Sequence, residues 1–454
     1  MPNIREKILS SYTVNATALK IVFYYNTFRK TYKFLKKSQW WSQEQLEEYQ
    51  LHQLSKLLQH AYEHVPYYTK VFDTLGLTPN NIQSLKDLQK LPFLTKEVIR
   101  EHIEDLKATN YPKSKFEYTR TGGSTGYPLQ FYKEKGVWLT RLMAYSKIMM
   151  DWADCNFLDR CVFITGRDDP WKYQLFGRML VLSSFYMNEE YLPQFIQKIR
   201  KLKPNYILAY PSAVTILANY MKKNNVEVFP SIKVIICHAE TLYEWQRDLV
   251  EETFHCRVHD QHGLREQTIL GGTCEHSNYY HMFPEYGILE LVDKDGNPVT
   301  KEGEMGEMVG TGFHTYFSPF IRYRTGDLGV YTAEKCECGR NYPLLKKIEG
   351  RVQDFVVSKT KKLVPFTRIH HLVAESTQQV KECQFYQDTG GELVLNIIKK
   401  VNYTDKDTHA IQKGFQQILR DEFTLTIRFV DQIPRTKRGK YQFLIQKLPI
   451  DFVP

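Results

Sequence analysis

The first 110 residues show the spacing of apolar residues that is typical of helices. Ser42, followed three residues later by Gln45, forms a capping-box pattern that predicts the start of a helix. Apolar residues then recur at near-helical spacing, namely Leu46, Tyr49, Leu54, Leu57, Leu58 and Ala61. Pro66 is expected to end this helix because proline has no backbone N–H to donate. Residues 1–110 are therefore predicted to be a helical extension that packs on a larger domain.

From about residue 118, short runs of β-type residues alternate with helical patterns, as in α/β layers. Cys161–Thr165 and Val234–Cys237 are predicted to be buried strands, and Tyr286–Val292 a strand that enters a turn at Asp293–Gly296. The segment Gly350–Asp354 marks an expected boundary. The predicted fold class is α/β, with a large multi-layer domain over 111–350 and a small α+β domain over 351–454.

Length and composition indicate how many domains to expect and in which compartment the protein is found. A chain of 454 residues is expected to form two or more domains, and 42% apolar with 25% charged residues is ordinary for a globular protein. There is no run of about 18 apolar residues and no convincing secretory signal, so a cytoplasmic protein is expected. Eight cysteines in such a chain favour thiols or a metal site over a disulfide framework.

The positive charge is concentrated at the N-terminus. Residues 1–40 hold eight lysines and arginines against the single acidic residue Glu6, which is most of the net charge of +10. Aromatic residues are interspersed with these basic residues, a combination that suits an interfacial helix on an anionic membrane. The alternative is that the aromatic residues pack on the large domain while the lysines stay in water. Nucleic-acid binding is not expected, because no recognisable module for it is present.

A glycine-rich segment follows the first predicted change of pattern. Thr121, Gly122, Gly123, Ser124, Thr125 and Gly126 combine glycines, which let backbone N–H groups face a phosphate, with hydroxyl donors. The segment lacks the Gly-Lys-Ser/Thr of a Walker loop. Taken alone, it could equally be a flexible surface turn.

Four further segments carry residues suited to nucleotide chemistry. Asp260–Glu266 places an aromatic ring before glycine and a carboxylate three residues later, a pattern that suits stacking on a base and binding Mg²⁺ with phosphate. Phe320–Leu328 contains Asp327 after a glycine turn, where a carboxylate could accept from a ribose. Ile348–Asp354 lies at the expected boundary, and Pro434–Lys440 near the C-terminus. Each segment alone also fits an ordinary turn or a solvated surface.

In this order the five segments resemble the core motifs of the acyl-adenylate-forming superfamily. The closer resemblance is to the phenylacetate–CoA ligase family and its capsular-polysaccharide, or CapK-like, branch. This branch is also similar in Gln50–Leu54, Val65–Tyr68, Leu91–Glu97 and Ala209–Ser212. The resemblance runs from about residue 40 to the end and implies a large adenylate-forming domain followed by a small mobile domain.

The resemblance also implies roles for individual residues. The loop Thr121–Gly126 would wrap the ATP phosphates, with Ser124 and Thr125 as hydroxyl donors. His238, Glu240 and Thr241 fall at the adenine-pocket turn, and His262 at the aromatic position beside adenine. Glu266 matches the magnesium carboxylate, Asp327 and Arg351 match ribose contacts, and Lys440 matches the catalytic lysine of adenylation. By analogy, Tyr210, Phe185, Tyr186 and His238 would line the acyl pocket.

The sequence departs from the family pattern at three places. The usual hinge aspartate, two residues after Arg351, is Gln353 here, and the usual glycine after that strand is replaced by Ser358–Lys362. The aromatic residue before Gly263 is His262, where tyrosine is commoner. These departures bear on domain rotation and on the acceptor more than on adenylation.

Three cysteines and a histidine form a candidate structural zinc set. Cys274 is followed by His281, and Cys336 and Cys338 come later, which together make the Cys₃His donor set of closed zinc sites. Some relatives in the phenylacetate–CoA ligase family look similar here and hold zinc. His276 is a competing ligand, and a turn with reduced thiols is the alternative.

The leading hypothesis is an enzyme that uses ATP and Mg²⁺ to activate a small carboxylic acid as acyl-AMP. The acceptor would then be the thiol of CoA or an amine, with surface-polysaccharide or secondary-metabolite synthesis as the setting. The alternative is a non-catalytic, nucleotide-binding relative in a membrane-associated assembly. The joint presence of Glu266, Asp327, Arg351 and Lys440 argues against that alternative.

Overall fold

The structure is a computed structural model that describes residues 25–112, 115–120, 129–351, 355–361, 363–366, 369, 372–436 and 441–448. Its N-terminal part is helical, as the apolar spacing predicts. The elements are α3 (Tyr25–Ser38), α4 (Gln43–His64), α5 (Pro66–Leu75), α6 (Lys96–Glu101) and the 3₁₀ turns η1 (Pro79–Asn81) and η2 (Lys86–Lys90). No helix in the described part of the chain combines the length and the apolar content that a bilayer span requires.

Helix α4 begins where the capping box predicts. The Ser42 side chain accepts from the backbone N–H of Gln45, and the Gln45 side chain accepts from the backbone N–H of Ser42. Pro66 follows the end of α4, as predicted, and is also the first residue of α5, where its missing N–H costs nothing. Two long-range hydrogen bonds tie these helices to the large domain, from the Gln50 amide to the Gly287 carbonyl of β11 (2.8 Å) and from the Tyr68 hydroxyl to the Pro319 carbonyl in the loop between β12 and β13 (2.9 Å).

The centre of the molecule is one twelve-stranded mixed sheet, in the order β11-β12-β13-β14-β10-β9-β8-β7-β6-β3-β5-β4. Its strands are β3 (Cys161–Thr165), β4 (Trp171–Gln174), β5 (Met179–Ser183), β6 (Tyr206–Ala209), β7 (Val234–His238), β8 (Arg257–Gly263), β9 (Leu270–Thr273), β10 (Tyr280–Met282), β11 (Gly287–Val292), β12 (Met305–Gly312), β13 (Tyr323–Tyr331) and β14 (Leu344–Arg351). The predicted strands at Cys161, Val234 and Tyr286 correspond to β3, β7 and β11.

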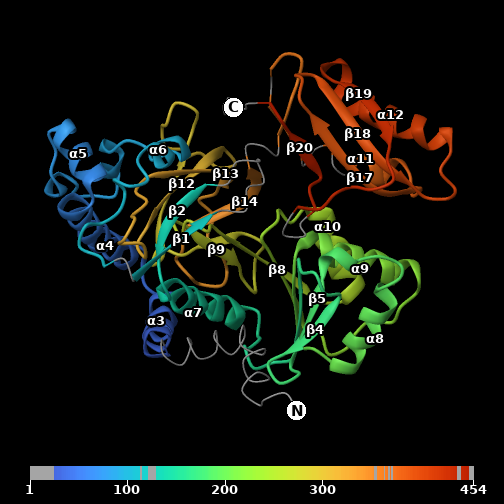
Figure 1. The fold of residues 1–454 in the computed structure, drawn as a ribbon, viewed down its shortest axis with the longest axis horizontal. Helices are drawn as coiled ribbons and strands as arrows, with labels where there is room; N and C mark the ends of the chain where they lie inside the picture. Colours follow the sequence, from blue (N-terminus) through green and yellow to red (C-terminus); the bar gives the residue numbers. More distant parts are fainter. Residues whose placement is uncertain are drawn as a thin grey trace, which may run out of the picture.

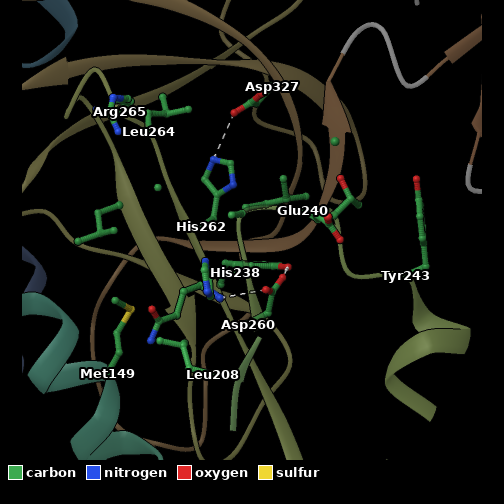
Figure 2. Close-up of a pocket in the computed structure, with 18 of the residues that line it drawn as sticks. Met149, Leu208, His238, Glu240, Tyr243, Asp260, His262, Leu264, Arg265 and Asp327 are labelled. Atoms are coloured by element: carbon green, nitrogen blue, oxygen red, sulfur yellow. Dashed lines mark hydrogen bonds and ion pairs between the residues drawn. The ribbon is translucent and has the colours of Figure 1, made fainter. Parts of the chain in front are cut away.

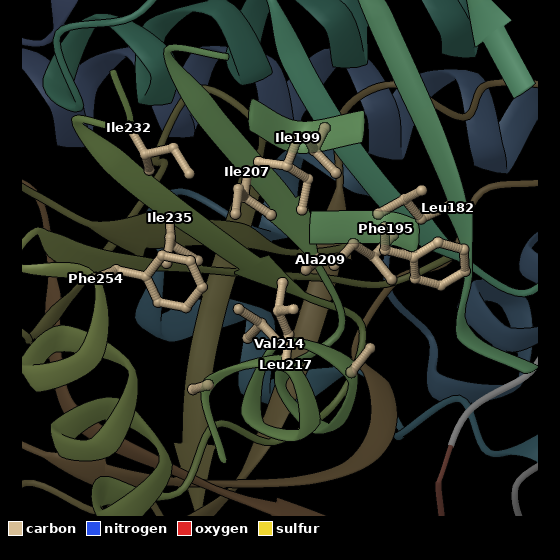
Figure 3. Packing of buried hydrophobic residues seen from close by; sticks show 14 of the residues in the cluster. Leu182, Phe195, Ile199, Ile207, Ala209, Val214, Leu217, Ile232, Ile235 and Phe254 are labelled. Carbon is tan, nitrogen blue, oxygen red and sulfur yellow. The ribbon is translucent and has the colours of Figure 1, made fainter. Parts of the chain in front are cut away.

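Helices cover the parallel half of this sheet. They are α7 (Val137–Trp152), α8 (Leu192–Leu202), α9 (Pro211–Lys223) and α10 (Glu244–Phe254), with the 3₁₀ turn η4 (Ser184–Tyr186). Strands β5, β3, β6, β7 and β8 run parallel to one another, and their side chains pack with α8, α9 and α10 into one buried core, part of which Figure 3 shows. Parallel strands that are buried in this way read as continuous apolar runs, which explains why β3 and β7 were recognisable in the sequence.

A two-stranded hairpin stands beside the large sheet. It consists of β1 (Phe116–Arg120) and β2 (Gln130–Glu134), and the ring of Phe116 stacks on that of Phe317 with centroids 3.9 Å apart. The glycine-rich segment Thr121–Gly126 connects these two strands in the sequence and lies outside the described residues.

The C-terminal part forms a separate α+β unit with its own four-stranded sheet, in the order β19-β18-β17-β20. Its elements are β15 (Phe355–Val357), β16 (Leu363–Pro365), α11 (Leu372–Ser376), β17 (Val380–Gln387), β18 (Glu392–Lys399), α12 (Asp405–Leu419), η7 (Arg420–Glu422), β19 (Thr424–Phe429) and β20 (Leu444–Gln446). The unit sits over the start of α10 (Figure 1), where the Tyr243 ring contacts those of Phe366 and Phe443 at centroid distances of 6.4 and 5.9 Å.

Candidate active site

Two neighbouring parallel strands end at the candidate site. Strand β7 ends with His238, and β8 ends with His262 and Gly263, so the turns that follow them lie at the same edge of the sheet. After β7, Ala239 adopts a left-handed conformation with φ 68°, and one Glu240 carboxylate oxygen accepts from the backbone N–H of Ser212 (3.0 Å) at the start of α9. The predicted adenine-pocket turn is thereby fixed to the end of a helix.

His262 and Asp327 face each other across the site. The Nε2 atom of His262 lies 3.4 Å from a carboxylate oxygen of Asp327, an approach marked in Figure 2. Asp327 lies on β13 directly opposite Arg351 of β14, so the two predicted ribose contacts are cross-strand neighbours in backbone register. The side chain of Arg351 lies outside the described residues.

Glu266 is buried and held in place by an aromatic hydroxyl. The Tyr323 hydroxyl donates to one carboxylate oxygen of Glu266 at 2.9 Å, and Glu266 also lines the cavity. The neighbouring Arg265 donates through its guanidinium to the Thr119 hydroxyl at 3.3 and 3.4 Å. Thr119 lies on β1 just before the glycine-rich segment, so the segment that carries Glu266 is bonded to the start of the predicted phosphate loop.

These residues surround one cavity of about 570 Å³ between the large domain and the C-terminal unit. His238, Glu240, Thr241, His262, Glu266 and Asp327 are all among its lining residues. The opposite wall comes from the C-terminal unit through Thr436, Tyr441, Gln442, Phe443 and Leu444. Lys440 lies outside the described residues, whereas Thr436 and Tyr441, on either side of its segment, both line the cavity.

The apolar part of the cavity differs from the sequence prediction. Leu142, Ser146 and Met149 of α7 line it together with Leu208, Leu270 and Tyr286, as does the predicted His238. Phe185, Tyr186 and Tyr210 are not among the described lining residues, and Tyr210 instead packs behind His238 with ring centroids 5.4 Å apart. The analogy placed four residues on the wall of the acyl pocket, and only His238 of these four is among the described lining residues.

A buried carboxyl on the cavity wall was not singled out from the sequence. Burial raises the pKa of Asp260 to about 6, although the Tyr280 hydroxyl, which donates to one carboxylate oxygen, opposes this shift. The other oxygen accepts from the backbone N–H of Gln261 (3.0 Å). Tyr323, Arg265 and Thr119 were also missed as partners of the motif residues. The only local signal for Asp260 and Arg265 was their place within Asp260–Glu266.

The four predicted zinc ligands converge at one point. The donor atoms of Cys274, His281, Cys336 and Cys338 all lie within 4.8 Å of one another. The Cys274 and Cys336 sulfurs are 3.5 Å apart, and His281 Nε2 is 3.2 Å from the Cys338 sulfur. With Zn–S bonds of about 2.3 Å, the edges of a tetrahedral site are about 3.8 Å long, so the cluster is close to the size that zinc needs.

The surroundings of the cluster also suit a metal. The Nδ1 atom of His281 lies 3.2 Å from the Tyr279 carbonyl, and a proton donated there leaves Nε2 as the ligand atom. Among the described residues, His276 is not part of the cluster, although its backbone N–H donates to the Cys274 sulfur (3.3 Å).

Comparison with known proteins agrees with this architecture. Residues 356–447 match the model of the CapK C-terminal domain. The chain is 26% identical to Protein CapK of Staphylococcus aureus over 84% of this chain and 85% of that protein. It is 24% identical to a phenylacetate-coenzyme A ligase of Thermus thermophilus over 87% of this chain and 95% of the ligase. The predicted resemblance to CapK and the phenylacetate–CoA ligases is confirmed.

Solved structures of one ligase in two states share this fold. A 2-hydroxyisobutyryl-CoA ligase in its postadenylation state, in complex with 2-HIB-AMP, aligns with a TM-score of 0.72 at 19% identity over 90% of this chain and 93% of that one. The same ligase in its thioesterification state, with 2-HIB-AMP and CoA, aligns with a TM-score of 0.59 at 19% identity over 89% and 90% of the two chains. The predicted fold class, α/β with a small C-terminal domain, is confirmed.

Proposed function

We propose that this protein is an adenylate-forming ligase, which uses ATP to convert a small carboxylic acid into an acyl-AMP and then transfers the acyl group to an acceptor. The observation that carries the proposal is the convergence of His262, Glu266 and Asp327 on one cavity, closed on its other side by residues that flank Lys440. The relatives named as CoA ligases support the same chemistry.

The adenylation step follows from the charges involved. A carboxylate oxygen of the acid forms a bond to the α-phosphorus of ATP, the bond from that phosphorus to the bridging oxygen breaks, and pyrophosphate leaves with the electron pair. Mg²⁺, when bound, offsets the negative charge on the phosphate oxygens. Glu266 suits its retention, because a single anchored carboxylate together with phosphate oxygens is a common magnesium environment.

The remaining site residues are assigned to the nucleotide. Asp327 would accept from the ribose hydroxyls, with Arg351 as a second ribose contact on the paired strand. His262 and the turn His238, Glu240 and Thr241 would surround the adenine. Thr121, Gly122, Gly123, Ser124, Thr125 and Gly126 would hold the phosphates. Lys440 would stabilise the charge that develops between the carboxylate and the α-phosphate.

The C-terminal unit is positioned as adenylation would require. Residues on both sides of Lys440 line the cavity, and the alignment with the 2-hydroxyisobutyryl-CoA ligase is better for its postadenylation state than for its thioesterification state. A rotation of this domain would then bring a different surface to the acyl-AMP for the second step. The thiol of CoA is the first acceptor to test, and an amine is the second.

The deciding experiment is ATP–pyrophosphate exchange over a panel of small carboxylic acids in the presence of Mg²⁺. Label should enter ATP with at least one acid and not without acid. Mass spectrometry of reactions that contain CoA or an amine then identifies the acceptor. If no acid in a broad panel supports exchange while the protein still binds ATP, the chain is a non-catalytic nucleotide-binding relative and the proposal is wrong.

Zinc is proposed as a structural metal at Cys274, His281, Cys336 and Cys338. Three thiolates and a neutral imidazole make a closed donor set, which would join the end of β9, strand β10 and the loop before β14. These are strands of the sheet that carries His262 and Asp327. The metal would therefore stabilise the site without entering the chemistry.

We also propose peripheral membrane contact through residues 1–40. Residues 1–24 lie outside the described part of the chain. On α3 the basic residues Arg29, Lys30, Lys33, Lys36 and Lys37 are exposed. The aromatic side chains of Phe28, Tyr32 and Phe34, however, pack against the large domain. For these three rings, packing on the protein is therefore favoured over insertion into a membrane. Helix α3 therefore offers charge to a membrane but little apolar surface.

A further inference from the structure

The turn between β4 and β5 carries one fully exposed aromatic side chain, and a neighbouring loop carries an exposed leucine. Phe176 is 104% exposed, and Leu158, on the loop that precedes β3, is 79% exposed. The two loops are joined, since the Arg178 guanidinium Nε donates to the Leu158 carbonyl at 2.8 Å and the Cys161 N–H donates to the Arg178 carbonyl. Tyr173 on the edge strand β4 adds a side chain that is 45% exposed. Three large apolar groups thus project from one small region.

The backbone of this turn is poorly matched to the residues in it. Leu175, Phe176 and Gly177 are consecutive left-handed residues, with φ 49°, 54° and 83°. Two hydrogen bonds hold the turn, from the Gly177 N–H to the Gln174 carbonyl and from the Arg178 N–H to the Leu175 carbonyl. Glycine and asparagine adopt this conformation readily, whereas leucine and phenylalanine do so at a cost. Phe176 bears this cost without burying its ring in the protein, so the fold itself does not account for it.

Both basic and acidic residues lie near the exposed apolar side chains. Arg160 and Arg178 are exposed and Lys172 is half-buried beside the turn, while the acidic residues of the neighbouring loop are Asp154 and Asp159. The exposed Arg29, Lys30 and Lys33 of α3 lie close by, because the Phe28 ring contacts Phe157, the residue before Leu158 (centroids 6.4 Å apart). In Figure 1, α3, the end of α7 and the β4–β5 turn lie along the same lower edge of the molecule.

We propose that Phe176 and Leu158 form the apolar anchor of a membrane-binding surface, and that α3 and the basic residues beside the turn hold this surface to an anionic bilayer. Exposed apolar side chains beside basic residues suit the boundary between headgroups and acyl chains. Neither attraction alone gives firm anchoring, whereas two together do. This proposal rests on the membrane contact proposed for residues 1–40 but not on the adenylation chemistry, and it supplies the apolar surface that α3 lacks.

The test is co-sedimentation of the full-length protein with vesicles of phosphatidylcholine alone or mixed with phosphatidylglycerol. We expect binding to the mixed vesicles only. The variants Phe176→Asn and Leu158→Ser should each lower the partition coefficient about tenfold or more, as expected for loss of one large buried apolar side chain. Val401→Asn is the matched control, because Val401 is 101% exposed on the C-terminal unit and should have no effect.

Thermal unfolding separates this role from a structural one. Asparagine fits a left-handed turn better than phenylalanine does, so Phe176→Asn should melt at the same temperature as the wild type or higher while losing vesicle binding. Pyrophosphate exchange without vesicles should stay unchanged in both variants. Unaltered vesicle binding by both variants would overturn the proposal. So would a wild-type dimer that Phe176→Asn dissociates without any vesicle binding, because the turn would then be a contact between two copies.

Discussion

Replacing one zinc ligand should destabilise the large domain by several kcal/mol. Cys274 and Cys336 are separated by 62 residues, and a bound metal would join them as a cross-link does. A cross-link that closes a loop of that length lowers the entropy of the unfolded chain and so raises the free energy of unfolding by about 4 kcal/mol. Cys336→Ser should therefore lower the free energy of unfolding by an amount of this order, together with the loss of one zinc per chain.

The assay combines metal analysis of protein purified without chelator with urea unfolding. Cys256→Ser is the matched control, since Cys256 is likewise a partly buried free thiol but lies outside the cluster, against the core of the parallel sheet. The control should keep its zinc and lose about 1 kcal/mol or less. Wild-type protein without zinc, or a Cys336→Ser variant that loses zinc with no more destabilisation than the control, would refute the reasoning.

Three other predictions concern the cavity. Lys440→Ala should reduce kcat for pyrophosphate exchange by about 100-fold or more, yet still consume a supplied acyl-adenylate, and equal loss of both steps would contradict its role. Glu266→Gln should raise the KM for Mg·ATP. Tyr323→Phe should raise it less, because it removes the 2.9 Å hydrogen bond to Glu266 but leaves the carboxylate in place. If magnesium titrations of both variants match the wild type, neither residue contributes to magnesium binding. Burial raises the pKa of Asp260 to about 6, so the folded state holds this proton more tightly than the unfolded state and stability falls as pH rises from about 4 to 6. Asp260→Asn has no titrating proton here, so its free energy of unfolding in urea should rise by up to about 3 kcal/mol relative to the wild type between about pH 4 and 6. A difference in free energy of unfolding that stays constant over this range would mean that the pKa of Asp260 is not raised.

The sequence predicts elements whose signal is local. The start of α4 depends on Ser42 and Gln45, three residues apart, and the buried strands β3 and β7 are continuous apolar runs. The short edge strand β4 was not predicted. Its four residues are half-buried or exposed, so they form no continuous apolar run that would mark a strand.

The same limit applies to the candidate site. His262, Glu266 and Asp327 belong to short motifs that can be read from neighbouring residues. Their partners cannot be read in this way, because Tyr323 is 57 residues from Glu266, and Thr119 is 146 residues from Arg265. Such contacts arise from the order of strands in the sheet rather than from local spacing. The sequence also could not decide whether the aromatic residues of α3 pack on the protein or enter a membrane, because an aromatic residue beside a lysine suits both settings equally well.

The contact between the C-terminal unit and α10 gives the protein a built-in optical probe. Trp245 lies at the start of α10, and its ring faces Phe443 of the C-terminal unit with centroids 6.4 Å apart. A rotation of that unit would separate the two rings and bring water to the indole, which shifts tryptophan emission to longer wavelength. With the chain's other five tryptophans replaced by phenylalanine, emission from Trp245 in a stopped-flow instrument would time each opening within a turnover, with no attached dye.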